Sequence, residues 1–243
     1  MIFVHTDYYR FYLFQFKINK INSHKKVKNL MFNEIKKISK KMIFPTYNYD
    51  FGKNKIFSLY KDKSQVGSFS EYIRKKFINK RSLVPMFSSC SFFKRKSIDF
   101  ASPVDPFGKE SDFDLLKKNK GKIIFFGSDF APTYIIFIEK NIPGGVPYRF
   151  NKFFNGRIKR NSKIINCKLI HYARPKKINI KYDLKKILKH LKKDSLIKEK
   201  KTKSGFRYLE LDALKFYNWS KSKLSKNIYY FLTKKSKIDF LKK

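Results

Sequence analysis

Polar and titratable side chains follow the first apolar segment of the chain directly. The run Ile2-Phe3-Val4 has the composition of a buried strand, and His5-Thr6-Asp7 comes next. A strand that delivers polar groups at its carboxyl end is a common way to build a site in α/β folds. His5 can line such a site, or it can lie half-buried with a hydrogen bond to the backbone, and the sequence favours neither interpretation.

The cysteines and the remaining histidines indicate no further chemistry. Cys90 and Cys167 lie far apart and form no Cys-x-x-Cys pair. This spacing predicts neither a disulfide framework nor a zinc site, and it fits a reducing compartment. Because no histidine accompanies Cys90, we expect a core residue rather than a nucleophile. His171 and His190 are expected to be structural or exposed.

The spacing of apolar residues predicts alternating strands and helices. Two capping-box patterns, Ser68-x-x-Glu71 and Ser111-x-x-Asp114, mark the starts of two helices. The alternation of the two element types predicts an α/β protein with a layered sheet. Helices are expected over residues 27–38, 69–77, 113–116 and 133–141, and strands over 2–4, 42–44, 123–126 and 164–173.

The last 60 or so residues change in character. Asp183 caps a helix, residues 203–210 have the pattern of a hairpin, and Asp212 caps another helix. This order fits a small winged module or a lid. From about residue 220 the chain is rich in Lys, Ser and Asn, so we expect it to fray. The expected domains are a core over 1–180 and a helix, hairpin and helix segment with a basic tail over 181–243.

The 243-residue chain carries a formal net charge of +40, which excludes an acidic or near-neutral protein. Only nine of its 58 basic residues are Arg. Proteins that read phosphates and bases rely on Arg, because its planar group forms paired hydrogen bonds. Lys, Phe, Ile, Asn and Tyr, whose codons are rich in A and T, make up 133 residues, whereas Ala occurs four times. We therefore attribute the charge mainly to an AT-rich genome and expect no nucleic-acid partner.

The composition predicts a folded protein outside the membrane. Aromatic residues make up 18% and hydrophobic residues 42% of the chain, more than a disordered basic tail would hold. The first residues lack the basic and apolar regions of a signal peptide, and the apolar runs are far shorter than the ~20 residues of a membrane span. We expect a cytoplasmic protein without a membrane partner, and the sequence leaves open whether it forms a homo-oligomer.

An ordered set of short motifs runs through residues 1–215, and the set is specific although each motif alone is weak. The motifs are His5-Thr6-Asp7; Pro45-Thr46-Tyr47-Asn48-Tyr49; the segment from Ser64 to Lys75; Arg81-Ser82 with Pro85; Phe107-Gly108 with Ser111; the segment from Gly121 to Gly127; Thr133 with Glu139; and Val146-Pro147-Tyr148-Arg149 with Lys152, Phe154 and Gly156. This set resembles the aminoglycoside 3-N-acetyltransferase family, particularly members that look like amino-sugar N-acetyltransferases.

The resemblance implies a three-layer α/β/α fold, acetyl-CoA as acyl donor, no metal, and a primary amine on an amino sugar as acceptor. A nucleotide-linked amino sugar is favoured over an aminoglycoside drug. The family motif Thr-x-x-His-x-x-Glu lies on a helix, where residues three and four apart share a face. In that motif the Glu orients the His, the His takes the proton of the amine, and the Thr serves the acyl or oxyanion side.

This sequence departs from the motif at its centre. Thr133 and Glu139 are present, but Ile136 stands at the His position, and Val84 stands where the family usually has another His. Three explanations stay open. Another base substitutes, the protein binds CoA or sugar without turnover, or proximity alone gives slow acetylation. The retained flanking pattern favours an active enzyme over an inactive relative.

The resemblance and the strand ends together nominate the site residues. Gly108 and Ser111 have the pattern of a loop and a helix cap, which can also hold a CoA phosphate. Arg81 is a further cationic candidate for that role. The expected catalytic residues are Glu139, Thr133 and His5, with Asp7 and Asp129 as alternative bases; the expected cofactor-binding residues are Thr6, Thr46, Arg74, Gly108 and Ser111; and the expected substrate-binding residues are Asp7, Asp129, Tyr148 and Arg149.

Overall fold

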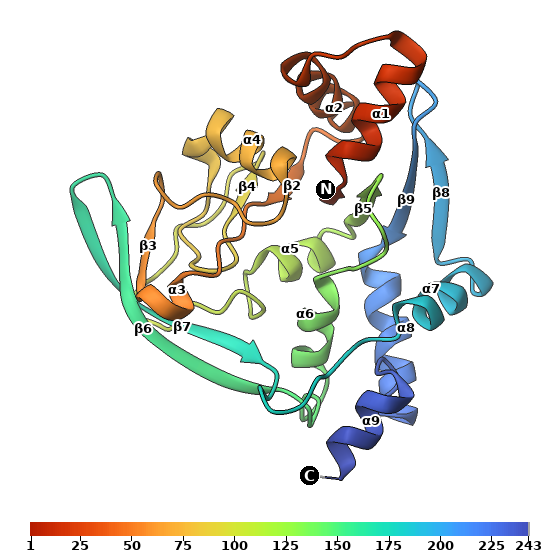
Figure 1. The fold of residues 1–243 in the computed structure, drawn as a ribbon. Coiled ribbons are helices and arrows are strands. Elements are labelled where there is room, and N and C mark those ends of the chain that lie inside the picture. Colours follow the sequence, from red (N-terminus) through yellow and green to blue (C-terminus); the bar gives the residue numbers. More distant parts are fainter. Residues whose placement is uncertain (243) are drawn as a thin grey trace.

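The protein is built on a six-stranded sheet, seen in a computed structural model that describes residues 1–242 (Figure 1). The strand order is β4-β2-β1-β5-β9-β8. The central strands β2, β1 and β5 are parallel, so their carboxyl ends meet at one edge, and the outer strands pair antiparallel with their neighbours. The strands are β1 (Ile2–Thr6), β2 (Met42–Pro45), β4 (Ser89–Ser91), β5 (Lys122–Phe126), β8 (Ile197–Lys201) and β9 (Arg207–Asp212).

The central strands are apolar on both faces. In β1, Ile2 and Val4 pack into one core cluster and Phe3 packs into the other, because successive side chains of a strand point to opposite faces. Strand β5 alternates in the same way, with Ile123 and Phe125 opposite Ile124 and Phe126. A sheet that is apolar on both faces has to be covered on both faces.

Two helical layers provide that cover. Helices α1 (Tyr8–Asn19), α2 (His24–Ile38) and α4 (Ser68–Lys76) pack on one face. Helices α5 (Asp112–Lys118), α6 (Tyr134–Asn141) and α8 (Ala213–Lys226) pack on the other. The expected three-layer α/β/α fold is confirmed. Helix α1 and strand β6 (Phe150–Arg160) were not among the predicted elements.

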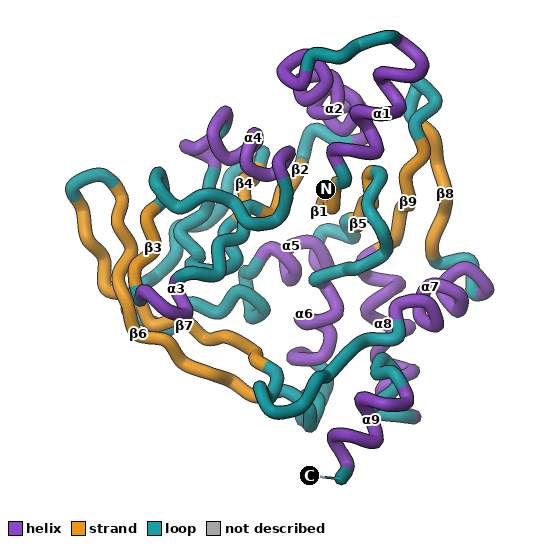
Figure 2. Tube along the Cα trace, viewed as in Figure 1, coloured by secondary structure: helices purple, strands orange, loops and turns teal. Residues whose placement is uncertain are grey.

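A second, three-stranded sheet curves away from the central one (Figure 2). It consists of β3 (Ile56–Ser58) and the long hairpin of β6 and β7 (Lys163–Ala173). Gly156 of β6 permits the close approach of helix α3 (Phe51–Asn54) and the residue after it. A Cβ atom on Gly156 would lie 2.3 Å from the carbonyl oxygen of Lys55 and 2.6 Å from the Phe51 ring.

The C-terminal segment has the predicted order of helix, hairpin and helix, namely α7 (Leu184–Lys193), β8–β9 and α8. Strand β9 pairs with β5, so the hairpin extends the central sheet. The expectation that the chain frays from about residue 220 is wrong. Leu224, Phe231 and Leu232 are buried in the core, and a ninth helix, α9 (Lys234–Leu241), follows. The domain boundary at residue 180 stays a prediction.

A short 3-10 helix, η1 (Ile78–Lys80), completes the elements of the chain between residues 1 and 242. Within that range, every helix is too short or too polar to cross a membrane.

Candidate active site

The carboxyl ends of β1 and β5 bring three predicted site residues together. Thr6 pairs with Phe126 in the sheet register, and Asp7 caps α1 by accepting a hydrogen bond of 3.1 Å from the Arg10 backbone N–H. The Arg10 guanidinium bonds Asp129 at 2.8 Å and lies 3.4 Å from Asp7. Asp7 and Asp129, predicted to bind substrate, therefore share one arginine. Both carboxylates remain accessible to solvent.

His5 lies in the same strand end, on the face covered by α5 and α6. Its ring stacks on Phe125, with 5.2 Å between centroids and 8° between planes, and it lies 5.2 Å from the Phe3 ring. The Nε2 atom is buried and has no hydrogen-bond partner in the described chain. Burial lowers the pKa of His5 to about 4, because desolvation disfavours the imidazolium. His5 is therefore neutral at pH 7, with one ring nitrogen unsatisfied.

Thr133 stands at the start of α6 and lies near Tyr47, which follows β2. The Tyr47 ring is buried, and burial first, with Tyr49 and Asp112 nearby, raises its pKa well above the usual value. Tyr47 therefore keeps its O–H. We call His5, Thr6, Asp7, Tyr47, Asp129 and Thr133 the strand-edge site, because all follow or end the parallel strands or begin the helix after β5.

Glu139 lies away from solvent in a cluster of side chains that saturate its carboxylate. It is 0% exposed and accepts hydrogen bonds from the Tyr148 hydroxyl (2.8 Å), from Arg149 Nε (2.6 Å) and from the Tyr182 hydroxyl (2.5 Å). Arg149 also donates to the Tyr172 carbonyl at 2.7 Å and to the Tyr182 hydroxyl at 2.7 Å. Burial and the adjacent carboxylate raise the pKa of both phenols, Tyr148 and Tyr182.

We call these four residues, Glu139, Tyr148, Arg149 and Tyr182, the Glu139 cluster. It joins a predicted catalytic residue to two predicted substrate-binding residues. Tyr182 was missed, because a lone tyrosine before a helix cap gives no signal in the sequence. The structure thus unites Glu139, Tyr148 and Arg149 but surrounds the carboxylate with protein donors.

Ile136 occupies the middle of the motif as a partly buried aliphatic side chain. It packs against the core cluster under α6, and its backbone N–H donates to the Thr133 carbonyl at 3.0 Å. An isoleucine side chain can neither accept nor donate a proton. The link that a histidine would form between Thr133 and Glu139 is therefore missing from this helix.

Two of the predicted cofactor residues are tied into the protein. Thr46 is fully buried, and its hydroxyl donates to the Ser88 carbonyl at 3.0 Å. Arg74 donates to both oxygens of Glu71, each at 2.7 Å, and to the Tyr60 carbonyl at 2.8 Å. Arg81, the further candidate, is buried, and burial lowers its pKa to about 10. These contacts stabilise the protein itself. The cofactor-binding role of Thr46 and Arg74 stays a prediction.

Gly108 and Ser111 have local structural roles. A Cβ atom on Gly108 would lie 2.6 Å from an Asp105 carboxylate oxygen, so a larger residue there would require the Asp105 side chain to shift. The Ser111 hydroxyl caps α5 by accepting from the Asp114 backbone N–H at 3.3 Å. The first turn of α5 carries Asp112 and Asp114, which would repel an anion. The cofactor-binding role of Gly108 and Ser111 stays a prediction.

A basic groove that the sequence did not indicate lies between α2 and α4. It encloses about 540 Å³. Asn29 Oδ1 accepts from the Tyr72 hydroxyl at 2.5 Å and from Lys76 Nζ at 2.7 Å. The single carboxylate of the lining, Glu71, is compensated by Arg74. The lining residues are Lys25, Lys28, Asn29, Ser68, Glu71, Tyr72, Lys75 and Lys76.

The basic groove adjoins the strand-edge site through the start of α1. Tyr8 follows Asp7, and its hydroxyl lies 2.6 Å from His24 Nδ1 at the start of α2. Lys28 of the groove lies 5.0 Å from the centroid of the Tyr8 ring. A molecule long enough to leave the groove past Tyr8 would reach the carboxyl end of β1.

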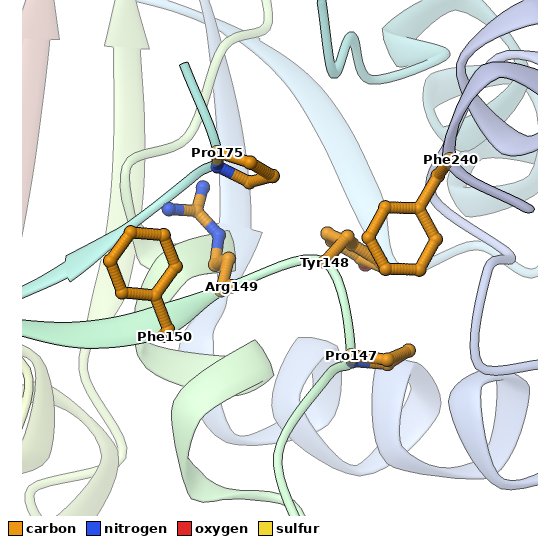
Figure 3. Close-up of a pocket in the computed structure, with 6 residues that line it drawn as sticks. All are labelled: Pro147, Tyr148, Arg149, Phe150, Pro175 and Phe240. Carbon is orange, nitrogen blue, oxygen red and sulfur yellow. The ribbon is translucent and has the colours of Figure 1, made fainter. Parts of the chain in front are cut away.

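A second hollow, of about 420 Å³, lies beside the Glu139 cluster near the C-terminus (Figure 3). Tyr148 and Arg149 line it together with Pro147, Phe150, Pro175 and Phe240. Its walls are mostly apolar, and Arg149 already bonds Glu139. Among residues 1–242, no group of three or more His, Cys, Asp and Glu side chains is placed to hold a metal ion.

Comparison with known proteins finds a similarity in structure but none in sequence. No protein-family model and no curated protein matches the sequence. The AAC-IIIb protein in a binary complex with CoASH matches with a TM-score of 0.67 and 12% identity, over 93% of this chain and 89% of that chain. The apoenzyme of aminoglycoside acetyltransferase AAC(3)-IVa matches with a TM-score of 0.63 and 12% identity, over 99% and 89%.

A third match is the YokD protein from Bacillus subtilis, with a TM-score of 0.59 and 12% identity, over 93% of this chain and 92% of that chain. These matches cover nearly the whole of each protein. The chain therefore has the fold of the aminoglycoside acetyltransferases, as the sequence resemblance implied.

Proposed function

We propose that the protein is an acetyl-CoA-dependent N-acetyltransferase that acts on the amine of an amino sugar. Two observations together carry the proposal. The chain shares its fold, over 93% of its length, with a protein whose structure contains CoASH, and a neutral histidine with an unpaired buried nitrogen lies at the carboxyl edge of its parallel strands. Ligands of open α/β sheets bind at this edge.

In this proposal the strand-edge site supplies the proton acceptor and the oxyanion donors. An amine attacks a thioester only as the neutral base, so a group must take its proton. His5 is neutral, and its Nε2 is not used by another protein group. Tyr47 and Thr133 carry hydroxyls that can donate to the oxyanion, and the raised pKa of Tyr47 keeps it a donor.

The low pKa of His5 also predicts a slow reaction. A general base works best when its pKa lies near the working pH, and the pKa of His5, about 4, lies well below pH 7. Glu139 is not the base in this scheme, because Tyr148, Arg149 and Tyr182 occupy its oxygens. Its carboxylate positions α6, and through α6 it positions Thr133.

The basic groove is the proposed place of the CoA phosphates. Four lysines, the Tyr72 hydroxyl and the Ser68 hydroxyl line a concave surface, and the carboxylate that joins them is compensated. Phosphates carry several negative charges, so they would be attracted to such a surface. From the groove, the pantetheine arm would pass Tyr8 and place the thioester at His5.

The charge of the protein bears on the acceptor. The strand-edge site offers two carboxylates, Asp7 and Asp129, and Arg10 compensates both. A polycationic aminoglycoside would therefore meet a chain of net charge +40 with little acidic surface to receive it. A nucleotide-linked amino sugar carries negative phosphates, so we infer this acceptor class. The cytoplasmic location and a homo-oligomer stay predictions.

The test is release of free thiol from acetyl-CoA with a panel of nucleotide-linked amino sugars and aminoglycosides. We expect turnover with a nucleotide-linked sugar and a kcat about 10²-fold lower in His5→Phe, with CoA affinity unchanged. His171→Phe is the matched control, because His171 is also a buried ring with an unpaired nitrogen. Absence of turnover with every amine, or equal loss in both variants, would contradict the proposal.

The second candidate is a relative that binds CoA without turnover. It is favoured by Ile136 in the motif and by the saturated carboxylate of Glu139. It predicts CoA binding in calorimetry, weakened in a Lys28→Gln/Lys76→Gln variant, with no thiol release. In that case Ile136→His tests whether a base alone restores the reaction. If CoA does not bind at all, both candidates fail.

A further inference from the structure

Helix α1 carries an apolar stripe on the side that it turns away from the sheet. Tyr9, Leu13 and Phe16 are 65%, 37% and 48% exposed, and their spacing of four and three residues places them in one row. The opposite side of the helix is buried through Phe11. We call Tyr9, Leu13 and Phe16 the α1 stripe. A row of large exposed apolar side chains on one helix indicates an interaction surface.

Basic residues outnumber acidic residues in the sequence around the α1 stripe, where the nearest acidic residue is the N-cap Asp7. The 26 residues from Tyr8 to Asn33 contain six Lys and Arg and no Asp or Glu. Lys17 and Lys20 are exposed in and just after the last turn of α1. The stripe therefore lies among more basic than acidic side chains, and the two carboxylates at the start of α1, Asp7 and Asp129, are paired with Arg10.

Neighbouring elements add lysines on both sides of α1. On one side, Phe14 lies 5.2 Å from Phe206, ring centroid to ring centroid, so the turn of the β8–β9 hairpin reaches α1 with the exposed Lys201 and Lys203 (Figure 1). On the other side, Tyr12 stacks on His24 at 4.6 Å, which places the start of α2 beside α1. The exposed Lys25 and Lys26 follow His24 directly.

This arrangement selects the chemistry of the partner. A second copy of the chain would bring the same lysines face to face, so like charges would oppose its binding. Leu13 and the exposed Ile18 in the last turn offer nothing to a nucleic acid, which is read by aromatic stacking and hydrogen bonds. An amphipathic helix with aromatic and aliphatic residues among lysines matches the interface of an anionic bilayer.

We propose that the α1 stripe docks the protein on the surface of anionic phospholipid membranes. Twelve residues form a helix of roughly 18 Å, which is too short to span a bilayer but suited to lie in its interface. Tyr9, Leu13 and Phe16 enter the boundary between headgroups and acyl chains, and the lysines contact the phosphates. This proposal replaces the expectation that no membrane takes part, and it does not depend on the proposed enzymatic activity.

The test is flotation of the full chain with vesicles of phosphatidylcholine alone and with about 30% phosphatidylserine. We expect binding to the anionic vesicles only. Leu13→Gln/Phe16→Gln should lower the partition coefficient by about tenfold or more, because two apolar side chains no longer enter the interface. At about 0.5 M salt, screening should weaken the binding of the wild type to the anionic vesicles, because the lysines contribute less to it.

Phe153→Gln/Ile164→Gln is the matched control, since both side chains are exposed on the β6–β7 hairpin at 52% and 57%. It should bind like the wild type, and circular dichroism should show all three proteins folded. If Leu13→Gln/Phe16→Gln and the wild type bind the anionic vesicles equally, net charge alone explains the binding and the proposal is overturned. The proposal would also be overturned if that variant lost a dimer, or lost affinity for single-stranded RNA, while it kept its vesicle binding.

Discussion

The Glu139 cluster and the strand-edge site are both held by the core, but their polar atoms are used differently. In the Glu139 cluster, three donors surround one carboxylate, and the guanidinium of Arg149 bonds Glu139, Tyr172 and Tyr182. In the strand-edge site, His5 Nε2 is buried without a partner among residues 1–242. One region is saturated by the protein, and the other retains an unused hydrogen-bonding atom.

This difference has a physical meaning. A buried charge is stable only when it is paired and hydrogen-bonded, so the Glu139 cluster has the pattern of a group that fixes structure. A buried polar atom without a partner costs free energy, and such a cost persists most often where a ligand or a reaction uses the atom. The contrast is the reason that we propose a structural role for Glu139 and a chemical role for His5.

The largest expected effect comes from breaking the saturated cluster. Arg149→Met leaves the Glu139 carboxylate buried without its cation, so we expect the free energy of unfolding to fall by about 3–5 kcal/mol. Urea unfolding followed by circular dichroism measures this loss. Arg157→Met on the exposed side of β6 is the control and should change stability by less than about 0.5 kcal/mol. A similar value for both variants would remove the distinction between the two regions.

The next effect is a loss of stability in acid from the buried histidines. Burial lowers the pKa of His5 and of His171 to about 4, below the ordinary value of 6.5 that the unfolded chain would have. The unfolded state therefore binds more protons at low pH. The stabilising contribution is complete above pH 6.5 and is lost as the pH falls from 6.5 toward 4.

Between pH 7 and 4.5 we expect each ring to account for about 2 kcal/mol of the decrease in unfolding free energy. Urea unfolding at a series of pH values measures it, and His5→Phe should flatten the decrease by the share of one ring. The same slope in His5→Phe and wild type would show that the His5 ring is hydrated, against the strand-edge site as described.

The smallest effect concerns the phenol that the sequence did not indicate. Tyr182→Phe removes one hydroxyl that donates to Glu139 and accepts from Arg149, while the ion pair between those two residues stays. We expect a loss of about 1–3 kcal/mol in unfolding free energy, because two hydrogen bonds to charged groups are lost while the ion pair remains. If Tyr182→Phe is as damaging as Arg149→Met, the cluster depends on the phenol rather than on the charge pair.

Much of the fold could be predicted where the spacing of apolar residues matches one buried face and one exposed face of an element. The spacing of Val27, Met31 and Ile35 predicted α2, because those side chains face the sheet and the lysines between them face water. Helix α1 escaped prediction because its apolar residues lie on both sides, Phe11 in the core and the α1 stripe in solvent. Helix α9 was missed because its lysines suggested a frayed tail, whereas Ser236 and Phe231 anchor the segment in the core.

The sequence predicted which residues belong to the site, but it did not predict which of them contact one another. Glu139, Tyr148 and Arg149 were all nominated, but in two different roles, and only the structure shows them bonded together. Sequence spacing cannot show that Tyr182, 43 residues after Glu139, points at the same carboxylate. The basic groove was also invisible, because its lysines come from two helices and resemble the many other lysines of the chain.

The sequence by itself determined the α/β class, the apolar strands, the polar residues at the end of the first strand and the absence of a histidine at position 136. These follow from local pattern, because the period of apolar residues and the identity of each side chain are written along the chain. The tertiary structure alone decided which polar groups are satisfied. That depends on side chains distant in sequence, such as Arg149 on Glu139 and Phe125 on His5, and on how fully they exclude water from each other.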